Sequence, residues 1–382
     1  MGGKKLSEGT NKHKSRKVAF DYLRIIAIFL VVVCHSIPDA YPYFGSGTAA
    51  VPRFVMLSLF DKLFSSLMAV AGRLGVPFFF MLSGYFLISG FQLTDKAISS
   101  FYKKRFLRLL ITFELWMILY EIFVRYILGV KAGLLQIITE LLFVTKEPSY
   151  PNILGSVMIQ IWFIPVILGI YLFMPVLVAI VKKLPERFSS WLIILAVGFN
   201  FVIPTVNILL KFFGKDIGVN VSLDHGFGGT EFGVYVLIGA LIRQGRLAKV
   251  SGQLLWGGTI IGIGVTWLMQ YIGNTLMSQS YFTWYDNLFI FIATVSIFEL
   301  VNRIRTDEYS FSNVIMVFSG FSLGIFLIHR PIQIILEKYL FLTNSSMFNF
   351  FINLFATYFL SLLFVYLLSK VKIFRIYLLY EK

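Results

Sequence analysis

Residues 18–37 read VAFDYLRIIAIFLVVVCHSI, an apolar run that contains one cation, Arg24, and one imidazole, His35. Ionisable residues inside a membrane span are costly, and by default they indicate a functional site. The two residues are eleven positions apart, which in a helix is about three turns, or about 16 Å along the axis. The stretch therefore predicts a membrane helix that presents both side chains on one face, near opposite ends.

The composition predicts a protein that crosses the membrane many times. Hydrophobic residues make up 58% of the 382 residues and charged residues 14%, and the mean hydropathy is +0.80. Apolar runs of about twenty residues recur, each long enough to cross a hydrocarbon core of about 30 Å as a helix. We expect an all-α integral membrane protein with about ten transmembrane helices. The predicted spans are residues 18–37, 70–91, 106–128, 157–181, 191–210, 232–242, 253–273, 285–301, 313–336 and 348–369.

The net charge of +15 is distributed unevenly between alternate connections. One set of connections holds 23 lysines and arginines and the opposite set holds 7. By the positive-inside rule, both termini are expected in the cytoplasm. The charge is therefore a topology signal and an attraction to membrane lipid rather than a nucleic-acid site. We expect a basic, disordered tail at 1–17, one polytopic domain at 18–369 and a basic cytoplasmic tail at 370–382.

Several features limit other kinds of site. The single cysteine, Cys34, excludes an internal disulfide, and with four histidines at unrelated spacings no metal site is expected. Residues 54–68 and 134–143 have the pattern of interfacial helices. Their length leaves open whether they lie in the interface or re-enter the membrane.

Polar residues inside the predicted spans need a protein or water environment, because lipid offers no hydrogen bond. Glu121 and Arg125 are four apart and are expected to pair. His329 lies in GIFLIHRP at 324–331. A lone intramembrane histidine is more often a packing residue, but His35 and His329 both fall in the outer half of the membrane. Imidazole transfers protons readily near neutral pH, so the two are candidate catalytic groups.

A dense cationic cluster, KKRFLR at 103–108, opens the third predicted span. It reads as an ordinary positive-inside anchor. Alternatively Arg105 and Arg108, three apart on one helix face, are suited to holding phosphates by bidentate hydrogen bonds. In that case a cofactor that carries phosphates binds at the cytoplasmic side.

Five motifs in order resemble the acyltransferase 3 family of integral-membrane O-acyltransferases. They are DYLR at 21–24 with ten residues before His35, GVPFFFMLSGY at 75–85, RFLR at 105–108, WFIP at 162–165 followed by GIY at 169–171, and SLGIFLIH at 322–329. Arg24 and His35 match the family's first-span pair, and Arg105 and Arg108 match its RxxR motif. Phe326 departs from the pattern, because tyrosine is frequent at that position.

The resemblance implies acyl transfer, commonly of acetyl, from cytoplasmic acyl-CoA to a hydroxyl of an extracytoplasmic carbohydrate or cell-wall polymer. It also implies a cell membrane, with a bacterial plasma membrane as the expectation. Some relatives carry a fused extracytoplasmic domain that finishes the transfer. We expect this chain to act alone, with a separate partner protein or as a homo-oligomer.

Together the residues and the resemblance predict a site. Arg105 and Arg108 would bind the CoA phosphates, and Arg24 would guide the thioester into a channel between the first, third and ninth spans. His35 with His329 would deprotonate the acceptor or take the acyl group covalently. The alternative is a transporter or flippase of a lipid-linked glycan or organic anion, for which intramembrane arginine and histidine are equally suitable.

Overall fold

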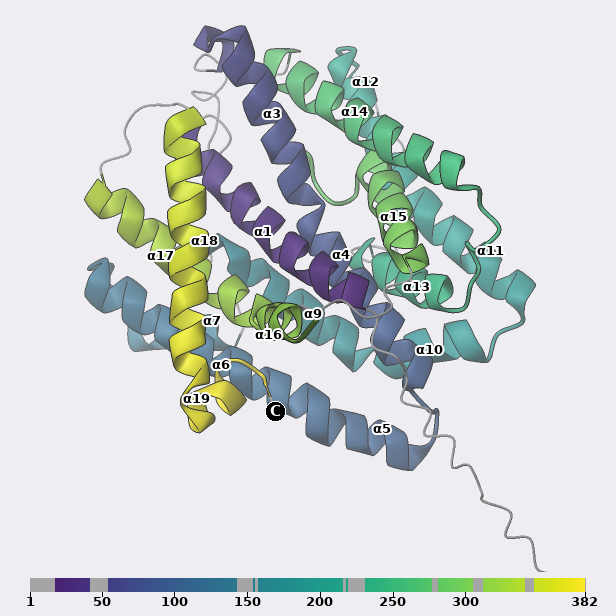
Figure 1. Ribbon diagram of the computed structural model, residues 1–382, viewed down its shortest axis with the longest axis horizontal. Coiled ribbons are helices and arrows are strands. Elements are labelled where there is room, and N and C mark those ends of the chain that lie inside the picture. Colours follow the sequence, from purple (N-terminus) through teal and green to yellow (C-terminus); the bar gives the residue numbers. More distant parts are fainter. Residues whose placement is uncertain are drawn as a thin grey trace, which may run out of the picture.

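The computed structural model describes residues 18–41, 54–142, 154, 157–215, 218, 231–276, 281–304, 312–340 and 347–381. Every regular element in these ranges is a helix (Figure 1). The α-helices are α1 Val18–Ala40, α3 Leu59–Arg73, α4 Gly75–Ser83, α5 Asp95–Phe101, α6 Leu107–Ile122, α7 Leu134–Leu141, α9 Phe163–Leu172, α10 Met174–Lys182, α11 Glu186–Val197, α12 Ile203–Phe212, α13 Glu231–Arg243, α14 Gly252–Leu276, α15 Leu288–Arg303, α16 Ser312–Gly320, α17 Ser322–Leu340, α18 Met347–Ser369 and α19 Lys372–Tyr377. Short π-helical segments extend several of them: Gly84–Ile88, Tyr102–Phe106, Phe123–Ile127 and Gly198–Val202.

The expected all-α membrane protein is confirmed, whereas the number of spans is not. In the described part of the chain, five helices are long and apolar enough to cross a membrane. The number is up to seven if each of two bent helix pairs, α9 with α10 and α16 with α17, is one span. All ten predicted segments coincide with helices, but α6, α13 and α15 have only 16, 13 and 16 residues. Ten spans and cytoplasmic termini remain predictions, and the tail at 1–17 lies outside the described residues.

The segment at 54–68, for which an interfacial helix was expected, runs into the second predicted span rather than ending before it. Ser58 caps α3 by accepting a hydrogen bond from the Asp61 N–H at 3.1 Å. The sequence from residue 59 to residue 71 contains no glycine or proline, so nothing interrupts the helix. A helix of 30 residues results, Leu59–Ile88, which contains the second predicted span. The second candidate, at 134–143, does form a short helix, α7.

Helix α1 lies at the centre of the molecule (Figure 1), where it contacts α3, α4, α15, α16, α17 and α18. Its contact with α3 and α4 is made by backbone against backbone. A Cβ atom on Gly72 would lie 2.6 Å from the Cys34 Cα, and one on Gly75 would lie 2.5 Å from the Ala27 carbonyl oxygen. Small residues allow such close approach in membrane proteins. Cys34 is thus a buried packing residue.

Close contacts at small residues continue along the same long helix. A Cβ on Gly84 would overlap the Val236 carbonyl of α13, and a Cβ on Gly239 would overlap the Met81 carbonyl. The Ser83 hydroxyl donates to the Phe79 carbonyl at 2.9 Å. These contacts pack α4 and the π-helical segment after it tightly against α13.

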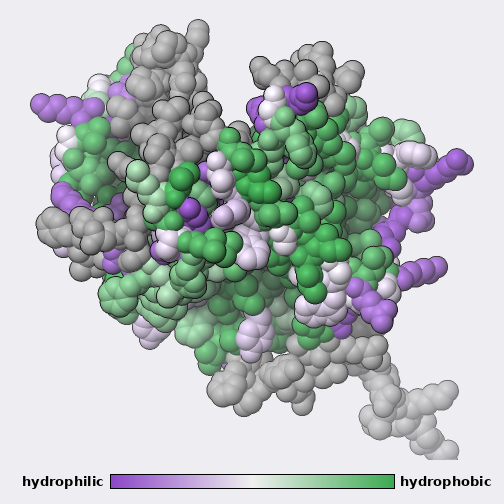
Figure 2. All heavy atoms as spheres, turned by 90° about the horizontal axis from the view of Figure 1, so that it is seen from above, coloured by the Kyte–Doolittle hydropathy of each residue, from purple (hydrophilic) through white to green (hydrophobic). Residues whose placement is uncertain are grey.

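Hydrophobic side chains cover most of the described surface that Figure 2 shows, while the most hydrophilic ones project from its edges. Large apolar residues are exposed on outer helices, among them Trp191 on α11, Trp256 on α14 and Phe359 on α18. A protein in water rarely exposes so much apolar surface. This surface is suited to lipid, in agreement with a multi-pass membrane protein.

The Gly72 contact gives a test of the framework. Gly72→Ala would place a methyl group against the Cys34 backbone, and overpacking of this kind costs about 1–3 kcal/mol. We expect its melting temperature in detergent to fall. Gly169→Ala is the matched control, because a Cβ there meets nothing within 4 Å, and alanine is the better helix former. Equal melting of Gly72→Ala and wild type would contradict the packing described.

Candidate functional site

Two imidazoles from distant parts of the sequence face each other in the interior. The ring centroids of His35 on α1 and His329 on α17 are 5.1 Å apart. His329 is fully buried, and its Nδ1 lies 2.7 Å from the Phe326 carbonyl oxygen. Because a carbonyl oxygen only accepts, Nδ1 of this imidazole is the donor, and in the neutral ring the lone pair resides on Nε2. That Nε2 atom is buried without a hydrogen-bond partner among the described residues.

The sequence next to His329 explains how α17 is held there. Pro331 has no N–H, so it cannot donate to the carbonyl of Leu327, four residues earlier. The Tyr120 hydroxyl of α6 donates to this Leu327 carbonyl at 2.5 Å. The third predicted span therefore supports the histidine segment through a carbonyl that the proline leaves open.

A buried polar network fixes the three helices around the histidine pair. The Ser36 hydroxyl of α1 donates to Asn353 Oδ1 of α18 at 3.1 Å, and Gln333 Nε2 of α17 donates to the Ser36 hydroxyl at 3.1 Å. One turn away, Arg330 forms an ion pair with Asp39 at 3.0 Å. Because its hydrogen bonds join α1 to α17 and α18, the network favours this arrangement of the three helices.

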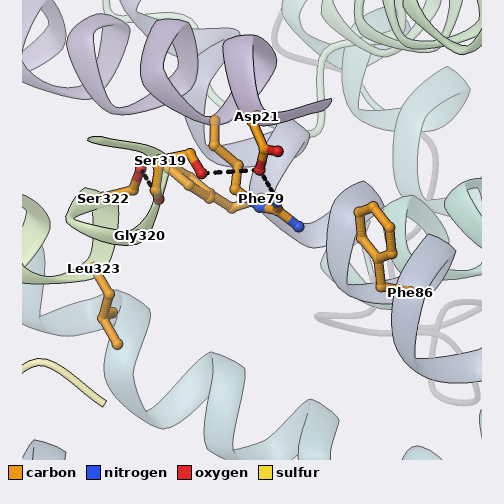
Figure 3. Close-up of a pocket in the computed structure, with 8 residues that line it drawn as sticks. Asp21, Phe79, Phe86, Ser319, Gly320, Ser322 and Leu323 are labelled. Carbon is orange, nitrogen blue, oxygen red and sulfur yellow. Dashed lines mark hydrogen bonds and ion pairs between the residues drawn. The ribbon is translucent and has the colours of Figure 1, made fainter. Parts of the chain in front are cut away.

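Arg24 lines a cavity of about 500 Å³, which we call the first cavity (Figure 3). Its Nη1 atom lies 2.7 Å from Asp21 Oδ1, to which the Ser319 hydroxyl also donates at 2.8 Å. The Arg24 guanidinium lies 4.9 Å from the centre of the Phe86 ring. The lining residues are Asp21, Arg24, Phe79, Phe86, Ser319, Gly320, Ser322 and Leu323. In Figure 3, Phe86 and Leu323 lie on opposite sides of this space.

Arg105 and Arg108 line a second cavity, of about 570 Å³. Lys104 lines it too, so three cations border one space. The C-terminal segment folds onto the two arginines. Tyr380 donates through its hydroxyl to the Arg105 carbonyl at 3.2 Å, its ring centre lies 4.9 Å from the Arg108 guanidinium, and Arg108 donates to the Glu381 carbonyl. Tyr380 adopts a φ of 57°, an uncommon left-handed conformation for this residue.

The two cavities are adjacent, because Phe86 lines both of them. The prediction that Arg24 and His35 share one face of the first span is confirmed, since both point toward the α16–α17 pair. The predicted channel between the first, third and ninth spans stays a prediction. The second span supplies Phe79 and Phe86 to the first cavity, which was not expected, while Arg105 and Arg108 line the second cavity. Neither histidine is among the lining residues of the two cavities.

Other intramembrane charges have structural partners. Arg125 Nε lies 2.9 Å from Glu121 Oε2, as its spacing predicted, and Arg125 Nη2 lies 2.7 Å from Glu140 Oε2. Glu140 belongs to α7 and was not expected there. Glu299 pairs with Arg303 at 2.7 Å. Among the described residues, no group of three His, Cys, Asp or Glu side chains is placed to hold a metal ion.

The Asp21–Arg24 pair can be tested by a double-mutant cycle. Arg24→Gln leaves a buried carboxylate without its guanidinium, and Asp21→Asn removes the opposite charge. Because Arg24 is partly exposed, we expect each change to lower the free energy of unfolding by about 2 kcal/mol. The double variant should lose less than the sum, with a coupling of about 1 kcal/mol. Denaturant titrations in mixed micelles measure this, and strictly additive losses would show that the pair does not stabilise the fold.

Comparisons with known proteins bear on the whole chain. A family model described as an acyltransferase domain, that of the acyltransferase 3 family, matches residues 17–370. Searches of curated proteins and of solved structures gave no match. The matched region includes both histidines of the interior pair and the arginines of both cavities. Since it spans nearly the entire sequence, the chain belongs to the acyltransferase 3 family.

Proposed function

We propose that the protein is a membrane O-acyltransferase that moves an acyl group, with acetyl as the first candidate, from cytoplasmic acyl-CoA to a hydroxyl of an extracytoplasmic glycan or cell-wall polymer. Family membership supports acyl transfer in a membrane. The observation that carries the proposal is the buried Nε2 atom of His329, which has a lone pair, no partner among the described residues and a second imidazole beside it. A base of this kind is what a hydroxyl needs to become a nucleophile.

The second cavity is the proposed site for the CoA phosphates. Guanidinium groups bind phosphate through paired hydrogen bonds, and Arg105 and Arg108 border the cavity together with Lys104. The adjacent first cavity, with Arg24, would take the uncharged arm of CoA beyond Phe86. Leu323 at the end of this cavity precedes His329 by six residues, or about 9 Å along α17. The extended arm of CoA is long enough to cover that distance.

The proposed reaction needs only one proton relay. The acceptor hydroxyl gives its proton to His329 Nε2 while its oxygen forms a bond to the thioester carbonyl carbon. The carbon–sulfur bond then breaks, and the leaving CoA thiolate takes the proton from the imidazolium. His35, whose ring centroid lies 5.1 Å from that of His329, would orient the acceptor or share the proton. Acceptor hydroxyl and acyl-CoA become ester and free CoA, with no other reactant consumed.

Binding of the donor tests the second cavity. We expect purified wild-type protein to bind acetyl-CoA, and Arg105→Ala/Arg108→Ala to bind it more than about tenfold more weakly, because charge-assisted hydrogen bonds contribute about 1.5–3 kcal/mol. Isothermal titration calorimetry measures both. Lys96→Ala/Lys103→Ala is the matched control, since it removes two charges from the same segment at residues that do not line the cavity.

Equal weakening in both double variants would show that the cluster acts as a general electrostatic anchor. Failure of the wild type to bind acetyl-CoA or a longer acyl-CoA would instead favour the transporter or flippase, which moves its substrate without consuming a thioester.

Replacement of His329 tests the proposed base. His329→Asn keeps a donor for the Phe326 carbonyl but has no basic nitrogen, so acetyl transfer should fall by about 10²–10⁴-fold. Affinity for acetyl-CoA should not change, because His329 does not line the second cavity. The measurement is transfer of labelled acetyl from acetyl-CoA to envelope material in membranes with equal amounts of protein. Full acetyl transfer by His329→Asn would show that His329 is not the base.

A further inference from the structure

Arg73 is the most buried arginine of the described residues. It is the last residue of α3 and is only 5% exposed. Four partly buried arginines each have a carboxylate oxygen at 2.7–3.0 Å: Arg24, Arg125, Arg303 and Arg330. No carboxylate oxygen of the described residues lies within 4.0 Å of an Arg73 nitrogen. Among the described residues this cation therefore has no ion pair in direct contact, although the charge of Asp286, beside Tyr285, acts on it from farther away.

Aromatic rings surround the Arg73 guanidinium instead. Its carbon atom Cζ lies 3.8 Å from the ring centre of Phe282, 4.8 Å from that of Trp284 and 5.0 Å from that of Tyr285. Nη1 donates to the Tyr285 hydroxyl at 3.2 Å, while the buried Nε has no partner. Rings compensate a buried cation in part, but a charge out of water without a counterion remains costly. The unused Nε donor and the lack of a carboxylate in direct contact leave this guanidinium able to bind an anion.

The close helix contact at Gly72 places this cation near the histidine pair. Because Gly72 lies against the backbone of Cys34, Arg73 is next to the point on α1 that immediately precedes His35. The charge of Arg73 also acts on the His35 imidazole. On its other side, Phe282 and Trp284 line a third cavity, of about 250 Å³. Arg73 therefore lies between the histidines and a separate aromatic cavity.

We propose that Arg73 is a catalytic residue that binds the oxyanion formed during acyl transfer. This inference rests on the proposed function. As the acceptor oxygen bonds to the acyl carbon, the carbonyl electron pair moves to the carbonyl oxygen, and the guanidinium binds the resulting negative charge. When the carbon–sulfur bond breaks, the pair returns to re-form the carbonyl and the thiolate leaves. A pre-organised cation in a site without water is effective in stabilising such a charge.

If Arg73 serves function at the expense of stability, its removal should not destabilise the protein. Arg73→Met replaces the charge with an apolar side chain of similar length, so the variant should melt at or above the temperature of the wild type in detergent. Arg125→Met is the matched control. It leaves Glu121 and Glu140 without their cation, and its melting temperature should fall.

Turnover is measured on the same samples, as CoA released from acetyl-CoA in membranes that contain the acceptor. For Arg73→Met we expect kcat to fall by about 10²–10³-fold, with KM for acetyl-CoA within about twofold of the wild-type value. Arg73→Lys keeps a positive charge but lacks the planar guanidinium, so its kcat should lie between those of the wild type and Arg73→Met.

The outcomes separate the two proposals. An Arg73→Met variant with wild-type kcat, or one destabilised as much as Arg125→Met with turnover reduced only in proportion to folded protein, would overturn the role of Arg73 while the transferase stands. Absence of any acetyl-CoA turnover by the wild type would overturn the proposed function and the role of Arg73 with it.

Discussion

The cost of an uncompensated charge in hydrocarbon governs the arrangement of this protein. The bundle answers that cost with specific pairs: Asp21 with Arg24, Asp39 with Arg330, and Glu121 and Glu140 with Arg125. All three also connect different helices, in the first case through the hydrogen bond from Ser319 to Asp21, so each helps to fix a helix position. His329 Nε2 and Arg73 Nε are among the buried polar atoms that have no hydrogen-bond partner in the described part of the chain, and these two carry the proposed chemistry.

The segment around His329 also depends on replacement of a missing hydrogen bond. Pro331 leaves the Leu327 carbonyl without its helical donor, and Tyr120 supplies a replacement. The Phe326 carbonyl accepts a hydrogen bond from His329 Nδ1. The hydrogen bond that Pro331 cannot make is thus replaced by one from α6, which holds α6 against α17 close to His329. The ring of Phe326 lies beside the same imidazole, with centroids 5.8 Å apart.

Local periodicity was sufficient to predict the helices, the shared face of Arg24 and His35, and the Glu121–Arg125 pair, because these depend on residues within one helix. For His35 and His329, the sequence predicted only a similar depth in the membrane, and it did not predict that the two rings are neighbours. Glu140, Phe86 and the rings around Arg73 could not be predicted, since they come from segments whose docking depends on tertiary packing. The long helix through residues 59–88 was misjudged at its start for a similar reason. A short amphipathic stretch looks the same whether it lies on a membrane or begins a span.

The position of the three cations around the second cavity has an electrical consequence under the proposed function. Each elementary charge that crosses a membrane potential of 100 mV involves about 2.3 kcal/mol of work. If the phosphates of the donor stop at Lys104, Arg105 and Arg108, only the neutral thioester arm enters the field across the membrane. The acetyl group is uncharged and the proton moves between neighbouring atoms, so no net charge crosses. Modification of the outer surface would then proceed at the same rate in energised and de-energised cells, without draining the ion gradients that the membrane maintains.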